Sequence, residues 1–257
     1  MNMQKPLLLL TNDDGINAPG IHALVEAVRP LGDILIVAPD SARSAQSNAL
    51  TVTIPLRARK LREEDGLNMY ECNGTPTDCA KLGLMQLADR RPSLILSGIN
   101  HGSNTSISVI YSGTMGAALE GCVDDIPSMG ISHFSYRPNA DLSRAKHYAA
   151  LFARELLTHG LPRFTCLNVN IPDVPQEKGV KICRQAAGYW SEEFTKRQDT
   201  AGHNYYWLGG EYVCCEPEAT DTDVWALRNG YVSVVPVQTD MTNYSFMQDL
   251  EKWHLVR

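Results

Sequence analysis

Two adjacent acids, Asp13 and Asp14, follow an apolar run from Leu7 to Leu10 after two intervening polar residues. A run without polar alternation is typical of a strand covered on both faces, as in the parallel sheets of α/β proteins. Ligands in such folds bind beyond the carboxyl ends of the strands. For one Asp at a strand end, capping of the next turn is the simpler explanation. Two in succession favour a binding site, where they would hold a cation or a group that needs one.

Two further predicted strands also end in oxygen-bearing side chains. Ser44 and Ser47 follow the apolar run 34–39, and Asn100 follows the run 94–97. Neighbouring strand ends in a parallel sheet can converge on one site. Carboxylate, hydroxyl and amide oxygens suit Mg²⁺, Mn²⁺ or Ca²⁺, whereas zinc is less favoured without thiolates or clustered imidazoles. The sequence thus predicts a divalent cation beside Asp13 and Asp14.

Ser112, Gly113 and Thr114 precede a run of small residues that predicts a tightly packed helix. The start of a helix offers free N–H groups and the positive end of the helix dipole, which together bind phosphate. The simpler interpretation of such a motif in isolation is an N-capping hydroxyl beside a packing glycine. Asn104, in a glycine-rich loop, is grouped with these residues, although asparagine there often only forms a turn.

Strand and helix patterns alternate along residues 1–172, which predicts an α/β fold with a mostly parallel sheet and helices on both faces. A helix over 21–28 follows the first strand, and Thr75 to Asp78 form a capping-box-like start to another. Residues 51–73 predict a hairpin that lies off the main sheet. The later predicted elements are a strand over 128–132, a helix over 141–158 and a strand over 166–171.

Beyond residue 172 the pattern changes to short β-like runs, at 180–183, 205–208, 212–215 and 231–237, with a helical tail around 246–255. We interpret residues 173–257 as a β-rich extension of a catalytic core formed by residues 1–172. No internal repeat or flexible linker interrupts the chain.

Composition excludes several classes of protein. A net charge of −6 argues against a general binder of nucleic acids, which would be basic. No apolar run approaches the length of a membrane span, and we expect a cytoplasmic protein that does not bind membranes. The seven cysteines are odd in number and scattered, which favours reduced thiols. Motifs for P-loop nucleotide hydrolases, dinucleotide enzymes, zincins and α/β serine hydrolases are absent.

Five motifs in order resemble the SurE family of survival-protein nucleotidases: residues 11–21, 37–48, 74–79, 97–100 and 111–114. The resemblance covers residues 7 to about 135, with a looser echo at 220–221 and 230–232. As a set, the motifs are highly specific. The sequence differs from the commoner family pattern at residues 41–42, 45–46 and 101–103. The resemblance implies that these residues lie near the substrate, so the differences bear on which base or sugar the protein prefers.

The resemblance implies a metal-dependent phosphomonoesterase that acts on nucleoside 5′- and 3′-monophosphates. It implies a Rossmann-like core and a C-terminal β extension that mediates homodimers or homotetramers. Carried over by position, the family's metal ligands are Asp13, Asp14, Ser44 and Asn100, the two aspartates being also the catalytic residues. Its residues on the phosphate side are Asn104, Ser112, Gly113 and Thr114. Mg²⁺ and Mn²⁺ are the first choices of metal and Ca²⁺ is an alternative.

Two other functions stay open from the residues alone. One is a metal-dependent transferase that uses a nucleotide sugar, and the other is a nucleotide-binding stress protein without catalysis. Two adjacent unpaired acids are of little use to a pure binder, which favours the enzyme. The nucleophile is open between a water activated by the metal and one of the aspartates.

Overall fold

The computed structural model describes residues 5–137 and 139–253. Its strands are β1 (Leu7–Thr11), β2 (Asp33–Pro39), β3 (Ala58–Glu64), β4 (Leu67–Cys72), β5 (Leu94–His101), β6 (Ser128–His133), β7 (Thr165–Ile171), β8 (Val180–Ile182), β9 (Gly188–Ser191), β10 (Phe194–Gln198), β11 (Asn204–Leu208), β12 (Glu211–Cys214) and β13 (Val232–Gln238). Its α-helices are α1 (Pro19–Val28), α2 (Pro76–Leu82), α3 (Gly113–Val123), α4 (Ser143–His159), α5 (Asp223–Arg228) and α6 (Tyr244–Glu251). A 3₁₀ turn, η3 (Ser106–Ile110), precedes α3.

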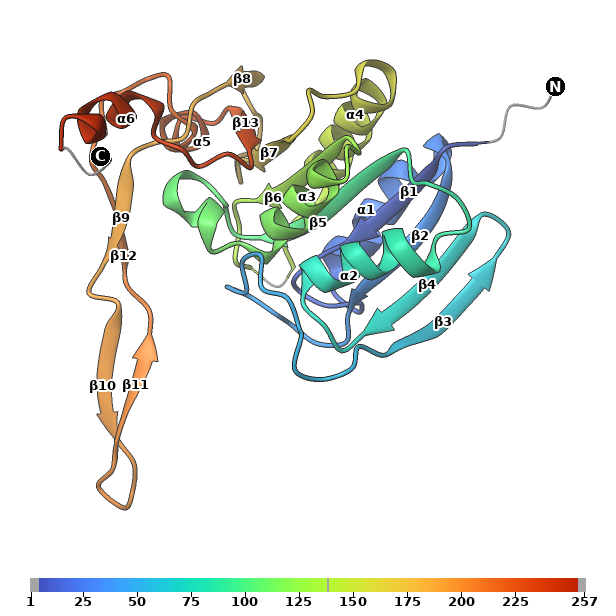
Figure 1. The fold of residues 1–257 in the computed structure, drawn as a ribbon, viewed down its shortest axis with the longest axis horizontal. Helices are drawn as coiled ribbons and strands as arrows, with labels where there is room; N and C mark the ends of the chain where they lie inside the picture. The colour runs from blue at the N-terminus through green and yellow to red at the C-terminus, as the bar shows by residue number, and fades with distance from the viewer. Residues whose placement is uncertain (1–4, 138, 254–257) are drawn as a thin grey trace.

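A nine-stranded sheet forms the centre of the molecule, in the order β3-β4-β2-β1-β5-β6-β7-β13-β8 (Figure 1). The strands from β4 to β7 in this order pair in parallel, and antiparallel pairs occur at β3–β4 and β7–β13. The chain leaves β1 toward β2 and later returns to its other side as β5. The gap between β1 and β5 is therefore the topological switch point, where such folds bind their ligands.

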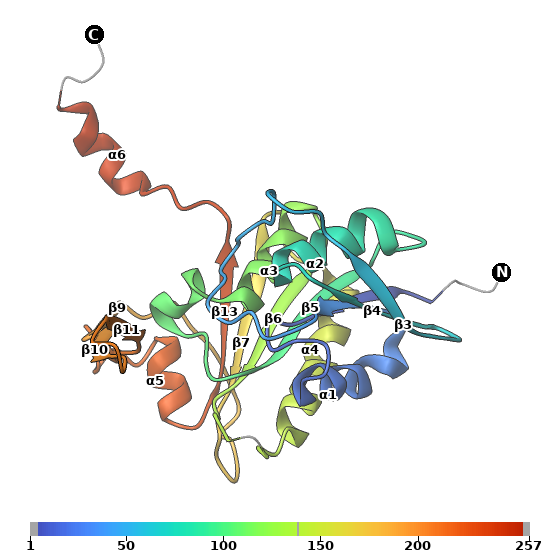
Figure 2. The same cartoon turned by 90° about the horizontal axis from the view of Figure 1, so that it is seen from below.

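Helices cover both faces of this sheet, as the sequence predicts. Figure 2 shows α1 and α4 on one side and α2 and α3 on the other. Alternate leucines of β1 face the two layers: Leu8 and Leu10 pack with α1 and α4, while Leu7 and Leu9 pack toward α2. Because both faces of β1 are buried, its four leucines need no polar alternation. The predicted α/β fold class is confirmed.

Several elements differ in detail from the expectation. The hairpin predicted over 51–73 is present as β3 and β4, but β4 pairs with β2, so the hairpin extends the main sheet. The burial of Leu67 and Met69 on alternate positions of β4 explains this pairing. The capping box predicted at Thr75 and Asp78 is confirmed. Helix α5 was not predicted, because its six residues are too few to show helical periodicity.

The region beyond residue 172 does not fold entirely apart from the sheet. Strands β8 and β13 belong to the central sheet, and β13 pairs with β7 over six residue pairs. By contrast, β9 with β12 and β10 with β11 form two-stranded ribbons that extend as an arm away from the sheet (Figure 1). The boundary at residue 172 stays a prediction. The predicted tail helix corresponds to α6, and residues 254 and 255 lie outside the described residues.

Within the described part of the chain, no helix combines the length and the apolar character needed to cross a membrane. The cysteines are free thiols, and five of the seven are buried.

A close contact between α1 and β5 generates a prediction about the fold. A Cβ added at Gly20 would lie 2.0 Å from the carbonyl oxygen of Ile99, the residue before Asn100. Alanine is favoured over glycine in a helix by at most about 1 kcal/mol, whereas overpacking costs roughly 1–3 kcal/mol. We expect Gly20→Ala to lower the free energy of unfolding by about 1–2 kcal/mol, measured by urea denaturation.

Gly209→Ala is the matched control, because an added Cβ there meets no atom within 4 Å. Its stability should stay within about 0.5 kcal/mol of the wild type. A Gly20→Ala protein as stable as the wild type would contradict the close packing of α1 on β5.

Candidate metal and phosphate site

Three predicted strand ends meet at the switch point. Asp13 and Asp14 follow β1, and Asn100 lies near the end of the neighbouring strand β5. The loop after β2 joins them, because the backbone N–H of Arg43 donates to the backbone oxygen of Asp13 over 2.7 Å. This bond places the loop that carries Ser44 against the end of β1.

Asp13 is buried, with 4% of its surface exposed. Its Oδ1 accepts a hydrogen bond of 2.6 Å from the hydroxyl of Thr114, in the first turn of α3. Burial raises the pKa of Asp13 to about 6, the Thr114 bond opposes this shift, and the charge of Asp14 adds to it. A carboxylate that has lost its water and has a like charge beside it is stabilised by a cation.

Asp14 and Asn100 approach the same point from neighbouring strands. Asp14 is half-buried, burial raises its pKa, and its Oδ2 accepts a hydrogen bond of 3.3 Å from the backbone N–H of His101. The Asn100 side chain donates from Nδ2 to the backbone oxygen of Gly102 over 2.8 Å. That bond turns the Asn100 oxygen away from Gly102 and leaves it able to bind a metal. The register of β5 against β6 shifts between Ser97 and Asn100, a local irregularity of the kind that re-aims a side chain.

The chemistry of these donors fits a hard divalent cation. Among the described residues, no three His, Cys, Asp or Glu side chains are grouped to hold a metal. A cation beside Asp13 and Asp14 would therefore take amide or hydroxyl oxygens and water as its other ligands, which suits Mg²⁺, Mn²⁺ or Ca²⁺ better than zinc. Ser44 is exposed, and within the described ranges no hydrogen bond joins it to either aspartate.

The start of α3 lies against Asp13. Ser112 is the N-cap of α3, and its hydroxyl accepts a hydrogen bond of 3.1 Å from the N–H of Met115. A Cβ added at Gly113 would lie 3.0 Å from the Cβ of Asp13, so glycine allows the helix backbone to come this close. The hydroxyl of Thr114 is engaged by Asp13, which leaves backbone N–H groups as the anion donors of this turn.

Asn104 lies in a buried polar network that the sequence analysis missed. Its backbone N–H donates to Asn170 over 2.8 Å, its side-chain amide donates to Ser132 over 2.9 Å, and its backbone oxygen accepts from Asn168 over 2.7 Å. Asn168 and Asn170 are both fully buried on β7. These two asparagines lie two positions apart and therefore on one face of an otherwise apolar strand, and this pattern was the signal in the sequence for a buried polar network. The network holds the loop after β5 in place.

The hydrogen bond between Thr114 and Asp13 generates a prediction about stability. Thr114→Val keeps the shape of the side chain but removes the donor, and a hydrogen bond to a charged group is worth about 1.5–3 kcal/mol. We expect Thr114→Val to lower the free energy of unfolding by about 2 kcal/mol, measured by urea denaturation without added metal. Thr114→Ser retains the hydroxyl and should lose less. A Thr114→Val protein as stable as the wild type, together with a larger loss in Thr114→Ser, would show that packing of the methyl group, and not the hydrogen bond, is what matters.

The chain is similar to several known proteins. The family model described as Survival protein SurE matches residues 8–192. The 5′-nucleotidase SurE of Bacteroides fragilis is 49% identical over 257 residues, which cover 99% of this chain and 100% of that protein. The 5′-nucleotidase SurE of Bacteroides thetaiotaomicron is 50% identical, over 97% of this chain and 96% of that protein. The crystal structure of the SurE protein from Aquifex aeolicus superposes with a TM-score of 0.81 at 38% identity, covering 96% of this chain and 99% of that one. The chain belongs to the SurE family.

Proposed function

We propose that this protein is a metal-dependent 5′-nucleotidase, which hydrolyses nucleoside 5′-monophosphates to nucleoside and phosphate and also accepts 3′-monophosphates. Relatives that are named 5′-nucleotidase SurE match the chain over nearly its full length. The observation that carries the proposal is the pair of adjacent, desolvated acids at the switch point, placed against the first turn of α3.

The proposed ligands of one divalent cation are Asp13, Asp14, Ser44 and Asn100, with Mg²⁺ or Mn²⁺ as the metal and Ca²⁺ as an alternative. Such a cation supplies Lewis-acid polarisation of the phosphoryl oxygens and a lowered pKa for water. The donor set has two formal negative charges, which a divalent cation would neutralise, so that the two acids would no longer repel an anionic substrate.

Other residues of the chain orient the proposed metal ligands and hold the phosphoryl group. Thr114 fixes the rotamer of Asp13, and the backbone of Gly102 orients the Asn100 amide. Backbone N–H groups at Ser112 to Thr114 and the adjacent Asn104 loop are proposed to hold the phosphoryl group as its charge develops. Because these donors are fixed by α3 and by the network from β7, they need little reorganisation during the reaction.

Phosphate release from a panel of nucleoside 5′- and 3′-monophosphates tests the proposal. Protein freed of metal with a chelator should release no phosphate, and Mg²⁺ or Mn²⁺ should restore the activity. We expect Asp14→Asn to lower kcat by about 100-fold or more, since it removes a charged ligand and its field at the reacting phosphate. Asp65→Asn, in the exposed turn between β3 and β4, is the matched control and should retain full activity.

Each alternative function has a distinct result in the same assay. A transferase would need a nucleotide sugar and an acceptor, and would release no phosphate from a lone monophosphate. A binding protein without catalysis would bind nucleotides in the presence of metal but release nothing. Absence of phosphate release from every member of the panel, with every metal, would overturn the proposal.

We also propose that the protein works as a homodimer or homotetramer. Large apolar side chains are exposed on the arm and on α6, among them Phe194, Trp207 and Leu208 on the arm and Phe246 and Trp253 toward the C-terminus. Further copies of the chain would remove this surface from water. The expected cytoplasmic location stays a prediction.

A further inference from the structure

A cavity of about 130 Å³ lies beside the candidate site, and its lining combines aromatic rings, hydroxyls and one guanidinium. Among the residues that line it are Phe134, Tyr136, Trp190, Tyr212 and Arg228. Sites that take whole drug-sized ligands measure roughly 300–1,000 Å³. This cavity is therefore suited to one part of a substrate and not to all of it.

The cavity is connected to the proposed metal ligands through the loop after β5. The ring of Tyr136 lies directly against Gly102, where an added Cβ would come within 2.5 Å of it. The same glycine accepts the hydrogen bond from the Asn100 side chain. Ser103 and Thr105, on either side of Asn104, contribute to the lining. One short loop thus borders both the phosphate side of the candidate site and the cavity.

The distance between the two places fits a mononucleotide. Strands β1, β5 and β6 are consecutive neighbours in the sheet. The Asp14 carboxylate accepts a hydrogen bond from the backbone N–H of His101, and His101 lies opposite His133 at the end of β6. One strand spacing is about 4.8 Å, which puts this carboxylate within roughly 10 Å of the end of β6. Asp13 follows β1, and Phe134 directly follows β6. A phosphate at Asp13 and a base beside Phe134 are within the span of one nucleoside monophosphate.

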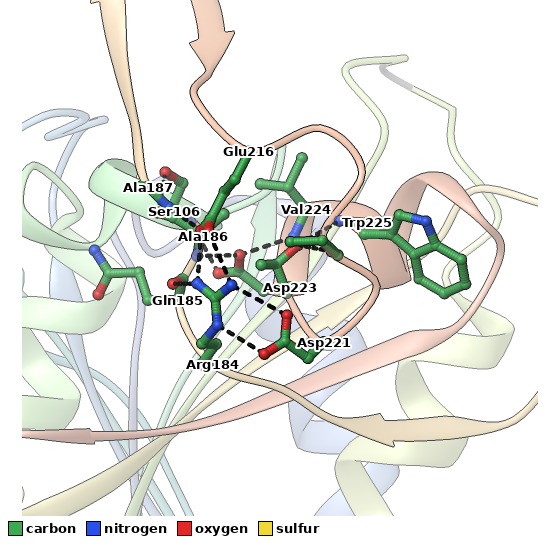
Figure 3. A network of polar contacts seen from close by, with 12 residues as sticks. Ser106, Arg184, Gln185, Ala186, Ala187, Glu216, Asp221, Asp223, Val224 and Trp225 are labelled. Carbon is green, nitrogen blue, oxygen red and sulfur yellow. Dashed lines mark hydrogen bonds and ion pairs between the residues drawn. The ribbon is translucent and has the colours of Figure 1, made fainter.

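A buried acid fixes three walls of the cavity relative to one another. Asp223 is fully buried and accepts hydrogen bonds of 2.8, 2.9 and 2.8 Å from the N–H groups of Ser106, Ala186 and Val224 (Figure 3). These residues belong to η3, to the segment that leads into β9 and to α5, and each of η3, β9 and α5 contributes to the lining of the cavity. Nearby, the guanidinium of Arg184 pairs with both Glu216 and Asp221 (Figure 3). The cavity is a built feature and not a gap between loose loops.

The lining has the chemistry of a nucleobase site. Trp190 and Tyr212 are paired across β9 and β12, and their rings meet edge to face with centroids 6.0 Å apart. Aromatic faces stack on bases, and a guanidinium pairs in a bidentate manner with O6 and N7 of guanine. Arg228 is exposed, and no ion pair within the described ranges engages it. A larger cavity of about 470 Å³ near Ser47 has no aromatic residue in its lining.

We propose that this cavity binds the base of the nucleotide substrate, and that Arg228 favours purines with an oxygen at position 6. The inference rests on the proposed nucleotidase activity and deepens it. Trp190 and Tyr212 contact the ring system, and Arg228 donates to O6 and N7. Guanine and hypoxanthine nucleotides present both acceptors, whereas adenine presents an amino group in place of O6.

Steady-state kinetics with GMP, IMP, AMP and ribose 5-phosphate test the proposal, since ribose 5-phosphate has the same ester but no base. The wild type should show a lower KM for GMP and IMP than for AMP. Arg228→Ala should raise the KM for GMP and IMP about ten-fold, with a smaller change for AMP, since one bidentate contact is lost. The kcat/KM for ribose 5-phosphate should not change. Arg154→Ala, an exposed arginine on α4, is the matched control.

Trp190→Leu provides a second variant that does not depend on Arg228. It should raise the KM for all three nucleotides and leave ribose 5-phosphate unaffected. Wild-type hydrolysis of the nucleotides with KM values unchanged by both variants would overturn the base site. Equal losses on nucleotides and on ribose 5-phosphate would overturn it as well. Failure of the wild type on all four esters would instead overturn the proposed nucleotidase activity.

Discussion

The burial of the Asp13 carboxylate at the end of β1 is the constraint around which the fold is arranged. A buried charge is costly unless other groups compensate for it. Four leucines commit β1 to the centre of the sheet, with helices on both of its faces, so the acid that follows is carried away from water. The first turn of α3 supplies part of the compensation through Thr114. A cation shared with Asp14 would supply the rest.

A comparison of Asp13 with Asp223 shows what distinguishes a reactive acid from a structural one. Both are buried, and burial raises the pKa of each. Asp223 accepts three backbone hydrogen bonds, from Ser106, Ala186 and Val224. It therefore serves as a rigid joint between η3, the segment before β9 and α5. Asp13 accepts fewer hydrogen bonds and has a second acid beside it, so its carboxylate remains able to bind a cation.

Sequence reasoning reached the residues whose role follows from one strand or one helix. The leucine run, the acids after it and the capping box at Thr75 are local patterns, and the structure contains each of them. The Asn104 network and Asp223 depend on contacts between residues 28 to 117 positions apart, which no local period reveals. The return of β13 to the sheet was missed for the same reason: its pairing with β7 depends on a partner more than 60 residues earlier in the chain. The cavity near Arg228 is lined by five segments that lie far apart in the sequence, so no local pattern could predict it.

The most direct test of the account is to locate the metal. Crystals grown with Mn²⁺ and inorganic phosphate would give an anomalous difference map that marks the cation independently of any assumed ligands. The account predicts one strong peak in contact with oxygens of Asp13, Asp14, Ser44 and Asn100, with the phosphate between this peak and the first turn of α3. A peak elsewhere, or a cation bound by Asp13 and Asp14 without Asn100 or Ser44, would contradict the proposed site.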